Sequence, residues 1–127
     1  MTSRITSVSI AAVDPIAVGE FWRAALGWEV VLQDDTGMDL AAPGTGMPTL
    51  EIGKVPDMKT HKNRLHFDLR ADGTSTEAEL DRLLSLGATR VEVGQGSDVS
   101  WVVLADPGGN EFCLLKRTVQ EVEAADG

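Results

Sequence analysis

The sequence predicts an α+β protein built from two consecutive βαβββ units. The order strand, helix, strand, strand, strand occurs once in each half of the chain. Each half holds one amphipathic helix that a glycine follows. The segments around the helices alternate apolar and polar residues with a period of two, as half-buried strands do. We therefore expect a single domain over residues 1–120, with units at about 4–55 and 63–117.

The first unit begins with an alternating stretch and continues into a capped helix. Residues 4–12 alternate as a strand does. Asp14 before Pro15 is typical of a helix N-cap followed by proline at the first helical position, and Gly27 suits the residue just beyond the C-terminal end. These signals predict a helix over 15–26. The remaining strands of this unit are expected at 28–33, 38–42 and 49–55, followed by a linker at 56–61.

The second unit repeats this order. Its first segment, KNRLHFDLR at 62–70, alternates and predicts a strand, and the helix expected at 76–86 ends at Gly87. One predicted face of the strand is apolar, with Leu65, Phe67 and Leu69, and the other is polar, with Arg64, His66 and Asp68. The later strands are expected at 88–93, 100–105 and 111–117, with turns at 94–98 and 106–110. Residues 118–127 are expected to form an acidic tail whose last part, EVEAADG at 121–127, is frayed.

The two halves can be superimposed as an internal repeat. Residues 6–12 align with 65–71, residues 25–31 with 85–91, and residues 49–52 with 111–114. This alignment matches polar positions: Ser7 with His66, Ser9 with Asp68, and Glu51 with Cys113. We expect the helices to cover the apolar faces and the two units to curl into a half-barrel whose concave side holds the polar residues. The alternative is that these faces are simply solvated.

Composition narrows the classes of partner. A net charge of −9 argues against nucleic acid and against anionic membrane surfaces, which both attract Lys and Arg. No apolar run reaches the length of a membrane span, and the N-terminal segment has no clear signal-peptide core, so we expect a cytoplasmic protein. The single cysteine, Cys113, excludes an internal disulfide. Small-molecule chemistry, small-molecule binding or protein contact remain.

Four stretches of the sequence resemble the vicinal oxygen chelate superfamily, in particular its glyoxalase-like, bleomycin-resistance-related branch of small bacterial proteins. They are FWRAALGWEV at 21–30, KNRLHFDLR at 62–70, LLSLGATRV at 83–91 and WVVLADPGGNEFCLL at 101–115. The resemblance covers residues 4–117. It implies two paired βαβββ modules forming a curved mixed sheet with a U-shaped cleft, the glyoxalase/bleomycin resistance/dioxygenase fold. It also implies a small-molecule ligand or substrate and is compatible with a homodimer.

The resemblance also implies where a metal ion would bind. In metal-dependent members, one divalent ion takes its ligands, commonly His and Glu, from the first and fourth strands of each module. The corresponding positions here are Ser7, Glu51, His66 and Cys113. Serine stands where histidine is usual and cysteine where glutamate is usual. His66, Glu51 and Cys113 remain as a three-ligand set for Zn, Fe, Mn or Ni.

Because that ligand set is incomplete, we expect a small-molecule-binding protein that needs no metal. The expected ligand-binding residues are Ser7, Arg64, Asp68 and Trp101. The alternative is a lyase, isomerase or dioxygenase acting on a vicinal-oxygen substrate, with a divalent metal or with His66 as the catalytic base.

Each of these residues also has a simpler interpretation. Arg64 could be a surface charge, Trp101 could pack in the sheet, and Cys113 could fill a buried space. His66 could be a neutral imidazole bound to a backbone group or to Asp68. Residues two apart on one strand face are often too distant for a direct bond, so the pair His66 and Asp68 is not expected to touch.

Overall fold

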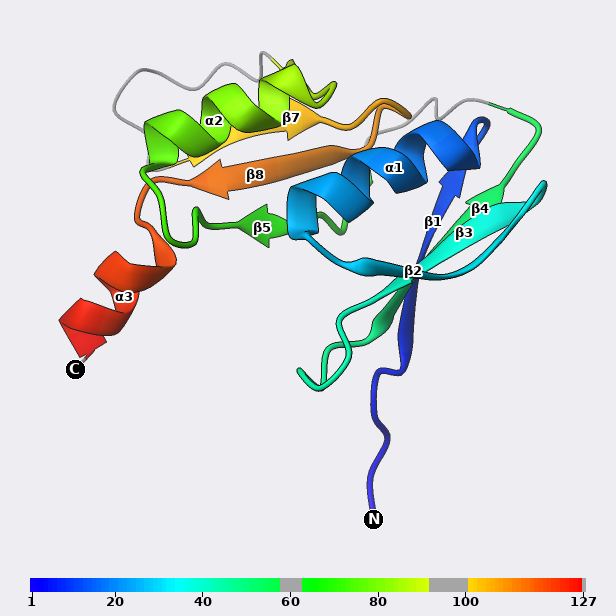
Figure 1. The fold of residues 1–127 in the computed structure, drawn as a ribbon, viewed down its shortest axis with the longest axis horizontal. Coiled ribbons are helices and arrows are strands. Elements are labelled where there is room, and N and C mark those ends of the chain that lie inside the picture. The colour runs from blue at the N-terminus through cyan, green and yellow to red at the C-terminus, as the bar shows by residue number, and fades with distance from the viewer. Residues whose placement is uncertain (58–62, 92–100, 127) are drawn as a thin grey trace. The chain divides into compact units, whose positions relative to one another are not determined.

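The computed structural model describes residues 1–57, 63–91 and 101–126. The chain divides into two compact units, which are unit 1 (Met1–Met58) and unit 2 (Lys59–Gly127). Each unit contains a four-stranded sheet and the elements of one βαβββ repeat (Figure 1). The predicted α+β class with two such repeats is confirmed. The predicted turn at 94–98, the end of the strand predicted to 93, and residues 58–61 of the linker lie outside the described residues.

Helix α1 (Pro15–Leu26) begins and ends where the sequence predicts. The Asp14 carboxylate accepts a hydrogen bond of 3.1 Å from the backbone N–H of Ala17, which satisfies a donor that the first helical turn leaves open. Gly27 adopts the left-handed conformation at φ 70°, which only glycine reaches without strain.

Four strands form the sheet of unit 1. They are β1 (Ser7–Ala12), β2 (Glu29–Asp34), β3 (Gly37–Ala41) and β4 (Thr49–Lys54). Their order is β1-β4-β3-β2, in which β1 and β4 run parallel and the other neighbours run antiparallel. Such a sheet is mixed, as the family resemblance implies.

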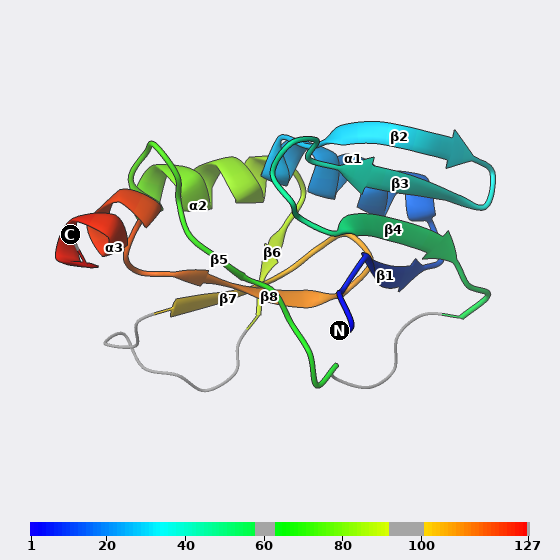
Figure 2. The ribbon, with the colours of Figure 1, turned by 90° about the horizontal axis from the view of Figure 1, so that it is seen from below.

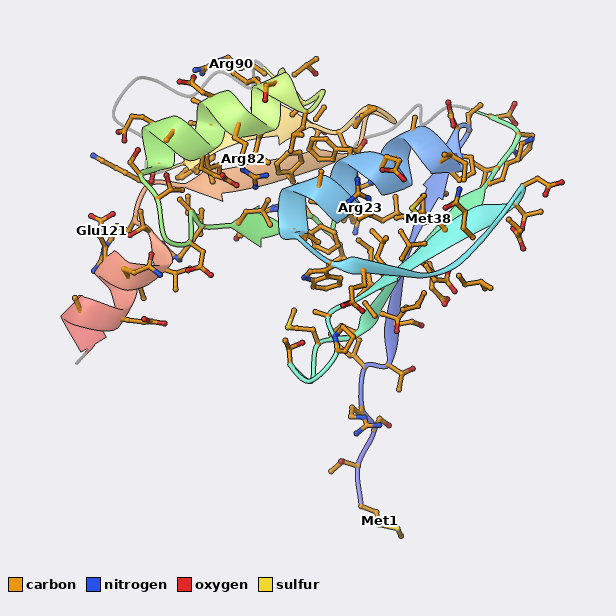
Figure 3. The ribbon with its side chains drawn as sticks, viewed as in Figure 1. Met1, Arg23, Met38, Arg82, Arg90 and Glu121 are labelled. Atoms are coloured by element: carbon orange, nitrogen blue, oxygen red, sulfur yellow. The ribbon has the colours of Figure 1, made fainter. Side chains whose placement is uncertain are left out.

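The core of unit 1 lies between α1 and one face of this sheet. Helix α1 contacts β1, β3 and β4, and the buried side chains alternate along β3 and β4. Phe21 and Trp22 contribute an edge-to-face ring pair with centroids 5.1 Å apart. Met38, labelled in Figure 3, lies close to Gly19, where an added Cβ would be 2.6 Å from the Met38 sulfur.

Strand β2 departs from the alternation that the sequence suggests. Val30, Val31 and Leu32 are exposed to 37%, 55% and 60%. The strand is at the edge of its sheet, and its register with β3 shifts between Val30 and Leu32. Such an irregularity turns side chains away from the face that the helix covers.

Unit 2 has the same topology in shorter strands. Its elements are β5 (Asp68–Leu69), α2 (Thr76–Ser85), β6 (Thr89–Arg90), β7 (Trp101–Ala105) and β8 (Glu111–Leu115). The strand order β5-β8-β7-β6 repeats that of unit 1, with β5 and β8 parallel. Figure 2 shows β5 running beside β8. Its largest fully buried side chains among the described residues are Leu83, Leu104, Phe112 and Leu114.

The strand predicted at 62–70 is wrong in its extent. Only Asp68 and Leu69 belong to β5, although the backbone N–H of Cys113 also donates to the Phe67 carbonyl at 2.9 Å. Leu65, predicted on the apolar face, is 90% exposed. Alternation reports the two faces of a segment, but a strand also needs a neighbour with which to pair, and β5 is at the edge of its sheet.

The frayed tail is also a wrong prediction, because Val119–Asp126 form helix α3 (Figure 1). Thr118 and Glu121 cap its start reciprocally. The backbone N–H of Glu121 donates to the Thr118 hydroxyl at 3.1 Å, and the Thr118 N–H donates to the Glu121 carboxylate at 3.0 Å. This is a capping box, and its sequence pattern Thr-x-x-Glu was available to sequence reasoning. The hydrogen bonds from Thr118 hold the pKa of Glu121 below its ordinary value.

No helix in the described ranges is long and apolar enough to cross a membrane.

Candidate functional site

The strand register places three residues of unit 2 in one row across its sheet. Asp68 on β5 pairs with Cys113 on β8, and Cys113 pairs with Val103 on β7. Side chains directly opposite in neighbouring strands point to the same face. The buried residues Phe112 and Leu114 alternate with Cys113 along β8, so this row lies on the face opposite the core of unit 2.

His66 joins this row and completes a cluster of three chemically active side chains. One potential ligand atom from each of His66, Asp68 and Cys113 lies within 4.8 Å of the others. His66 and Asp68 are exposed, whereas Cys113 is half-buried. The structure thus brings together a catalytic candidate, a ligand-binding candidate and a metal-ligand candidate that the sequence predicted separately.

His66 and Asp68 are closer than the sequence suggested. The imidazole Nδ1 lies 3.2 Å from the Asp68 Oδ1, at a separation where a protonated Nδ1 donates a hydrogen bond. The expectation that they would not touch assumed a regular strand through both residues, whereas His66 precedes β5. With Nδ1 against the carboxylate, Nε2 is the nitrogen that can meet a ligand or a proton.

An apolar area adjoins the cluster on the same face. Trp101 pairs with Leu115, two residues along β7 and β8 from the pair Val103 and Cys113. Trp101 is 40% exposed, whereas Val103 is buried. Trp101, an expected ligand-binding residue, therefore lies on the same face as the polar cluster, and it also belongs to strand β7. Arg64 is exposed and belongs to the segment that precedes His66.

Unit 1 carries different side chains at the matching positions. Ser9 pairs with Glu51 on β4, which reproduces the register of Asp68 with Cys113 and supports the internal alignment. Ser7 pairs with Thr49 in the same sheet. The sequence-predicted metal ligand Glu51 belongs to unit 1, so the group that unit 2 forms by itself takes Asp68 as its carboxylate.

Sequence reasoning missed Asp39, which pairs with Glu51 across β3 and β4. Both carboxylates are half-buried on the polar face of unit 1. Like charges directly opposite one another in neighbouring strands repel and destabilise the sheet. The pairing of two carboxylates is therefore unusual for adjacent strands. The signal was present in the sequence, because Asp39 stands between Met38 and Leu40 and must point away from the core.

Comparison with known families gives one match that spans both units. The model of the glyoxalase-like domain matches residues 7–115. No curated protein matches the chain in sequence.

Solved structures share the fold at low sequence identity. The fosfomycin resistance protein FosX of Listeria monocytogenes, solved as a mutant with Mn(II) and dihydroxypropylphosphonic acid, has a TM-score of 0.70 at 12% identity, covering 97% of this chain and 99% of that chain. FosX from Mesorhizobium loti gives 0.67 at 14% identity, covering 98% and 99%. A glyoxalase/bleomycin resistance protein/dioxygenase family enzyme from Burkholderia phytofirmans PsJN gives 0.60 at 18% identity, covering 90% and 98%. At these identities the likeness concerns the fold alone.

Proposed function

This chain belongs to the glyoxalase-like domain family, and from that premise we propose that it binds a small organic molecule on the polar face of the unit 2 sheet. The observation that carries the proposal is the row of Asp68, Cys113 and Val103, with His66 beside one end. A polar cluster next to an apolar wall suits a ligand with a flat apolar body and one oxygen-rich group.

Each candidate residue has a distinct part in this proposal. His66 presents Nε2 to an oxygen of the ligand while Asp68 holds the other nitrogen at 3.2 Å. Arg64 supplies a positive charge for a carboxylate or phosphonate. Trp101 offers a flat apolar surface to the body of the ligand. Ser7 of unit 1 is retained as a ligand-binding residue on the resemblance alone.

Binding without a metal follows from the donor set. Serine at position 7 is a poor metal ligand, and thiolate replaces the carboxylate that hard divalent ions prefer. The proposal therefore assigns recognition to hydrogen bonds and aromatic contact.

A thermal-shift screen of aromatic carboxylates and phosphonates in the presence of EDTA tests this proposal. We expect hits that stabilise the protein without metal, and we expect Arg64→Ala and Trp101→Ala to abolish the shift. Arg90→Ala is a matched control, since Arg90 is also an exposed arginine of unit 2 (Figure 3). An absence of hits, or hits that persist in both variants, would contradict the proposal.

A metal-dependent enzyme is the second candidate, and the cluster of His66, Asp68 and Cys113 favours it. Tetrahedral zinc with bonds of about 2.0–2.3 Å holds its ligand atoms about 3.3–3.8 Å apart. The ligand atoms of the cluster lie within 4.8 Å of one another, so inward movements of at most roughly 1.5 Å would reach that spacing, and imidazole, carboxylate and thiolate are all ligands that zinc takes. A bound ion would act as a Lewis acid on a carbonyl or on vicinal oxygens, as a lyase or isomerase requires, and iron would be needed for a dioxygenase.

Metal content per chain, measured by mass spectrometry on protein purified without a His-tag or chelator, separates the two candidates. The first candidate predicts metal far below one equivalent and no uptake of added Zn, Fe, Mn or Ni. Near-stoichiometric metal that disappears in His66→Ala would instead establish the second candidate and direct assays to vicinal-oxygen substrates.

A further inference from the structure

The segment that carries His66 has few regular backbone contacts. Residues 63–67 precede β5, which itself has only two residues. At the C-terminal end of the segment, the Phe67 carbonyl accepts from the backbone of Cys113 at 2.9 Å. At the other end, the Asn63 side chain donates from Nδ2 to the Asn110 Oδ1 at 3.3 Å. His66 lies between these two points in the sequence.

Asn110 belongs to the turn that connects β7 to β8. Asp106 is 3% exposed, and its carboxylate organises this turn by accepting from the backbone N–H groups of Gly108 and Asn110, both at 2.9 Å. It also accepts from the Asn110 side-chain Nδ2, at 3.1 Å to Oδ2 and 3.3 Å to Oδ1. The turn is thus fixed from within by one buried carboxylate.

These bonds determine which way the Asn110 amide faces. A carboxylate can only accept hydrogen bonds, so it selects the NH₂ end of the Asn110 amide. The carbonyl oxygen of that amide must then face away from Asp106, toward Asn63, and it meets a donor there. A chain of side-chain hydrogen bonds therefore leads from a buried anchor to the exposed segment.

We propose that Asp106, Asn110 and Asn63 form an amide bridge that positions the His66 imidazole against the Asp68 carboxylate. The same turn leads into β8, which carries Cys113, so one anchor sets both sides of the cluster. Asn110 and Asn63 are positioning residues in this account, because they act through the backbone of residues 63–67. The inference deepens the proposed function and rests on it for its biological purpose, but its geometry is tested without any ligand.

The test uses the tautomer of His66, read from long-range proton–nitrogen NMR spectra of the full chain at pH 8.5, where an ordinary imidazole is neutral. The chain has two histidines, so His66→Ala assigns the signals. In the wild type we expect mainly the Nδ1–H tautomer, since Nδ1 faces Asp68 at 3.2 Å. Asn63→Ala should lower the ratio of Nδ1–H to Nε2–H by roughly fivefold, the equivalent of one net hydrogen bond.

Three further variants separate positioning from folding. Asn63→Asp keeps the size of the side chain but sets a carboxylate against the Asn110 oxygen, so it should shift the tautomer at least as far as Asn63→Ala. Asn63→Gln keeps an amide donor and should restore part of the wild-type ratio. Asn110→Ala should shift the tautomer and also lower the melting temperature, because it removes the turn contact with Asp106.

The exposed position of Asn63 makes the outcome decisive. We expect Asn63→Ala to leave the melting temperature within about 2 °C of wild type while the tautomer ratio changes, since substitutions at exposed positions usually alter stability little. An unchanged ratio in both Asn63→Ala and Asn63→Asp would overturn the amide bridge. A changed ratio in a protein that fails the EDTA thermal-shift screen would uphold the bridge while rejecting the proposed function.

Discussion

Units 1 and 2 share a topology but differ in how their first strand is held. In unit 1, β1 pairs with β4 over six residues from Ser7 to Ala12. In unit 2, β5 pairs with β8 over Asp68 and Leu69 only. The long β1–β4 pairing in unit 1 places serine and threonine hydroxyls and the Glu51 carboxylate on its polar face. In unit 2, His66 lies outside the short β5–β8 pairing and approaches Asp68. The unit whose first strand has the shorter pairing is thus the one that brings an imidazole, a carboxylate and a thiol together.

The comparison also shows how a repeat separates structure from chemistry. The buried positions of both sheets are occupied by apolar side chains in both units, because a close-packed core requires them. The polar positions differ: serine faces glutamate in unit 1, whereas aspartate faces cysteine in unit 2. Matching register with different side chains is what we expect when one unit mainly supports the fold and the other contacts the ligand.

The largest expected effect concerns the core of unit 1. Trp22 is 1% exposed, and Trp22→Ala should lower the free energy of unfolding by about 3–5 kcal/mol. Hydrogen exchange should show the loss of protection mainly in β3 and β4. Phe112→Ala provides the reciprocal change for unit 2. Equal loss of protection in both units from either variant would show that the two cores are not independent.

A smaller effect is expected where α1 crosses β3. Gly19→Ala gains about 1 kcal/mol of helix propensity, but the new Cβ would lie 2.6 Å from the Met38 sulfur and 3.1 Å from its Cβ. Overpacking costs about 1–3 kcal/mol, so we expect net destabilisation in urea unfolding. In a Met38→Ala background the substitution should be close to neutral. If it destabilises equally in both backgrounds, Met38 is not the cause.

The proposal that unit 2 rather than unit 1 binds the ligand can be tested by replacing one carboxylate in each unit with the corresponding amide. Asp68→Asn should weaken binding of the strongest aromatic oxyanion from the screen by roughly tenfold, since a charged hydrogen bond to the imidazole is lost. Glu51→Gln, the corresponding change in unit 1, should leave the Kd unchanged. Isothermal titration in EDTA measures both. Weaker binding in Glu51→Gln with an unchanged Kd in Asp68→Asn would instead indicate that the ligand binds to unit 1.

The smallest expected effect is acid fraying of α3, which only unit 2 carries. The lowered pKa of Glu121 means that its capping contribution is present above the ordinary glutamate pKa and is lost as the pH falls through the lowered value. The protection factors of the Val122 and Glu123 amides, which correct for the intrinsic pH dependence of exchange, should therefore fall in acid. Glu121→Gln should remove this acid-dependent loss of protection, whereas Glu123→Gln should leave the acid response as in wild type.

Much of the fold could be predicted because its signals are local. The Asp14 cap, the glycine after α1 and the alternation of Leu50 and Ile52 each specify a backbone state or a buried face. The length of β5 could not be predicted, because pairing depends on a distant partner strand. Helix α3 begins with a capping box, a local signal that the acidic composition of the segment obscures.

The site was predicted residue by residue but not as an arrangement. His66, Asp68 and Cys113 were all identified from the repeat and the resemblance, yet their convergence depends on the register of β5 with β8. Asp39 was overlooked because the alignment of the two halves offered no counterpart for it. Asn63 and Asn110 act through side-chain bonds between segments 47 residues apart, which no local pattern reveals.

Chemical-shift mapping tests whether unit 2 holds the ligand. The strongest aromatic oxyanion from the thermal-shift screen would be titrated into ¹⁵N-labelled protein with EDTA present. We predict that the largest perturbations fall on Asp68, Val103 and Cys113 and on the indole N–H of Trp101. Perturbations centred on Ser9, Asp39 and Glu51 of unit 1, or a response that requires added metal, would contradict the account.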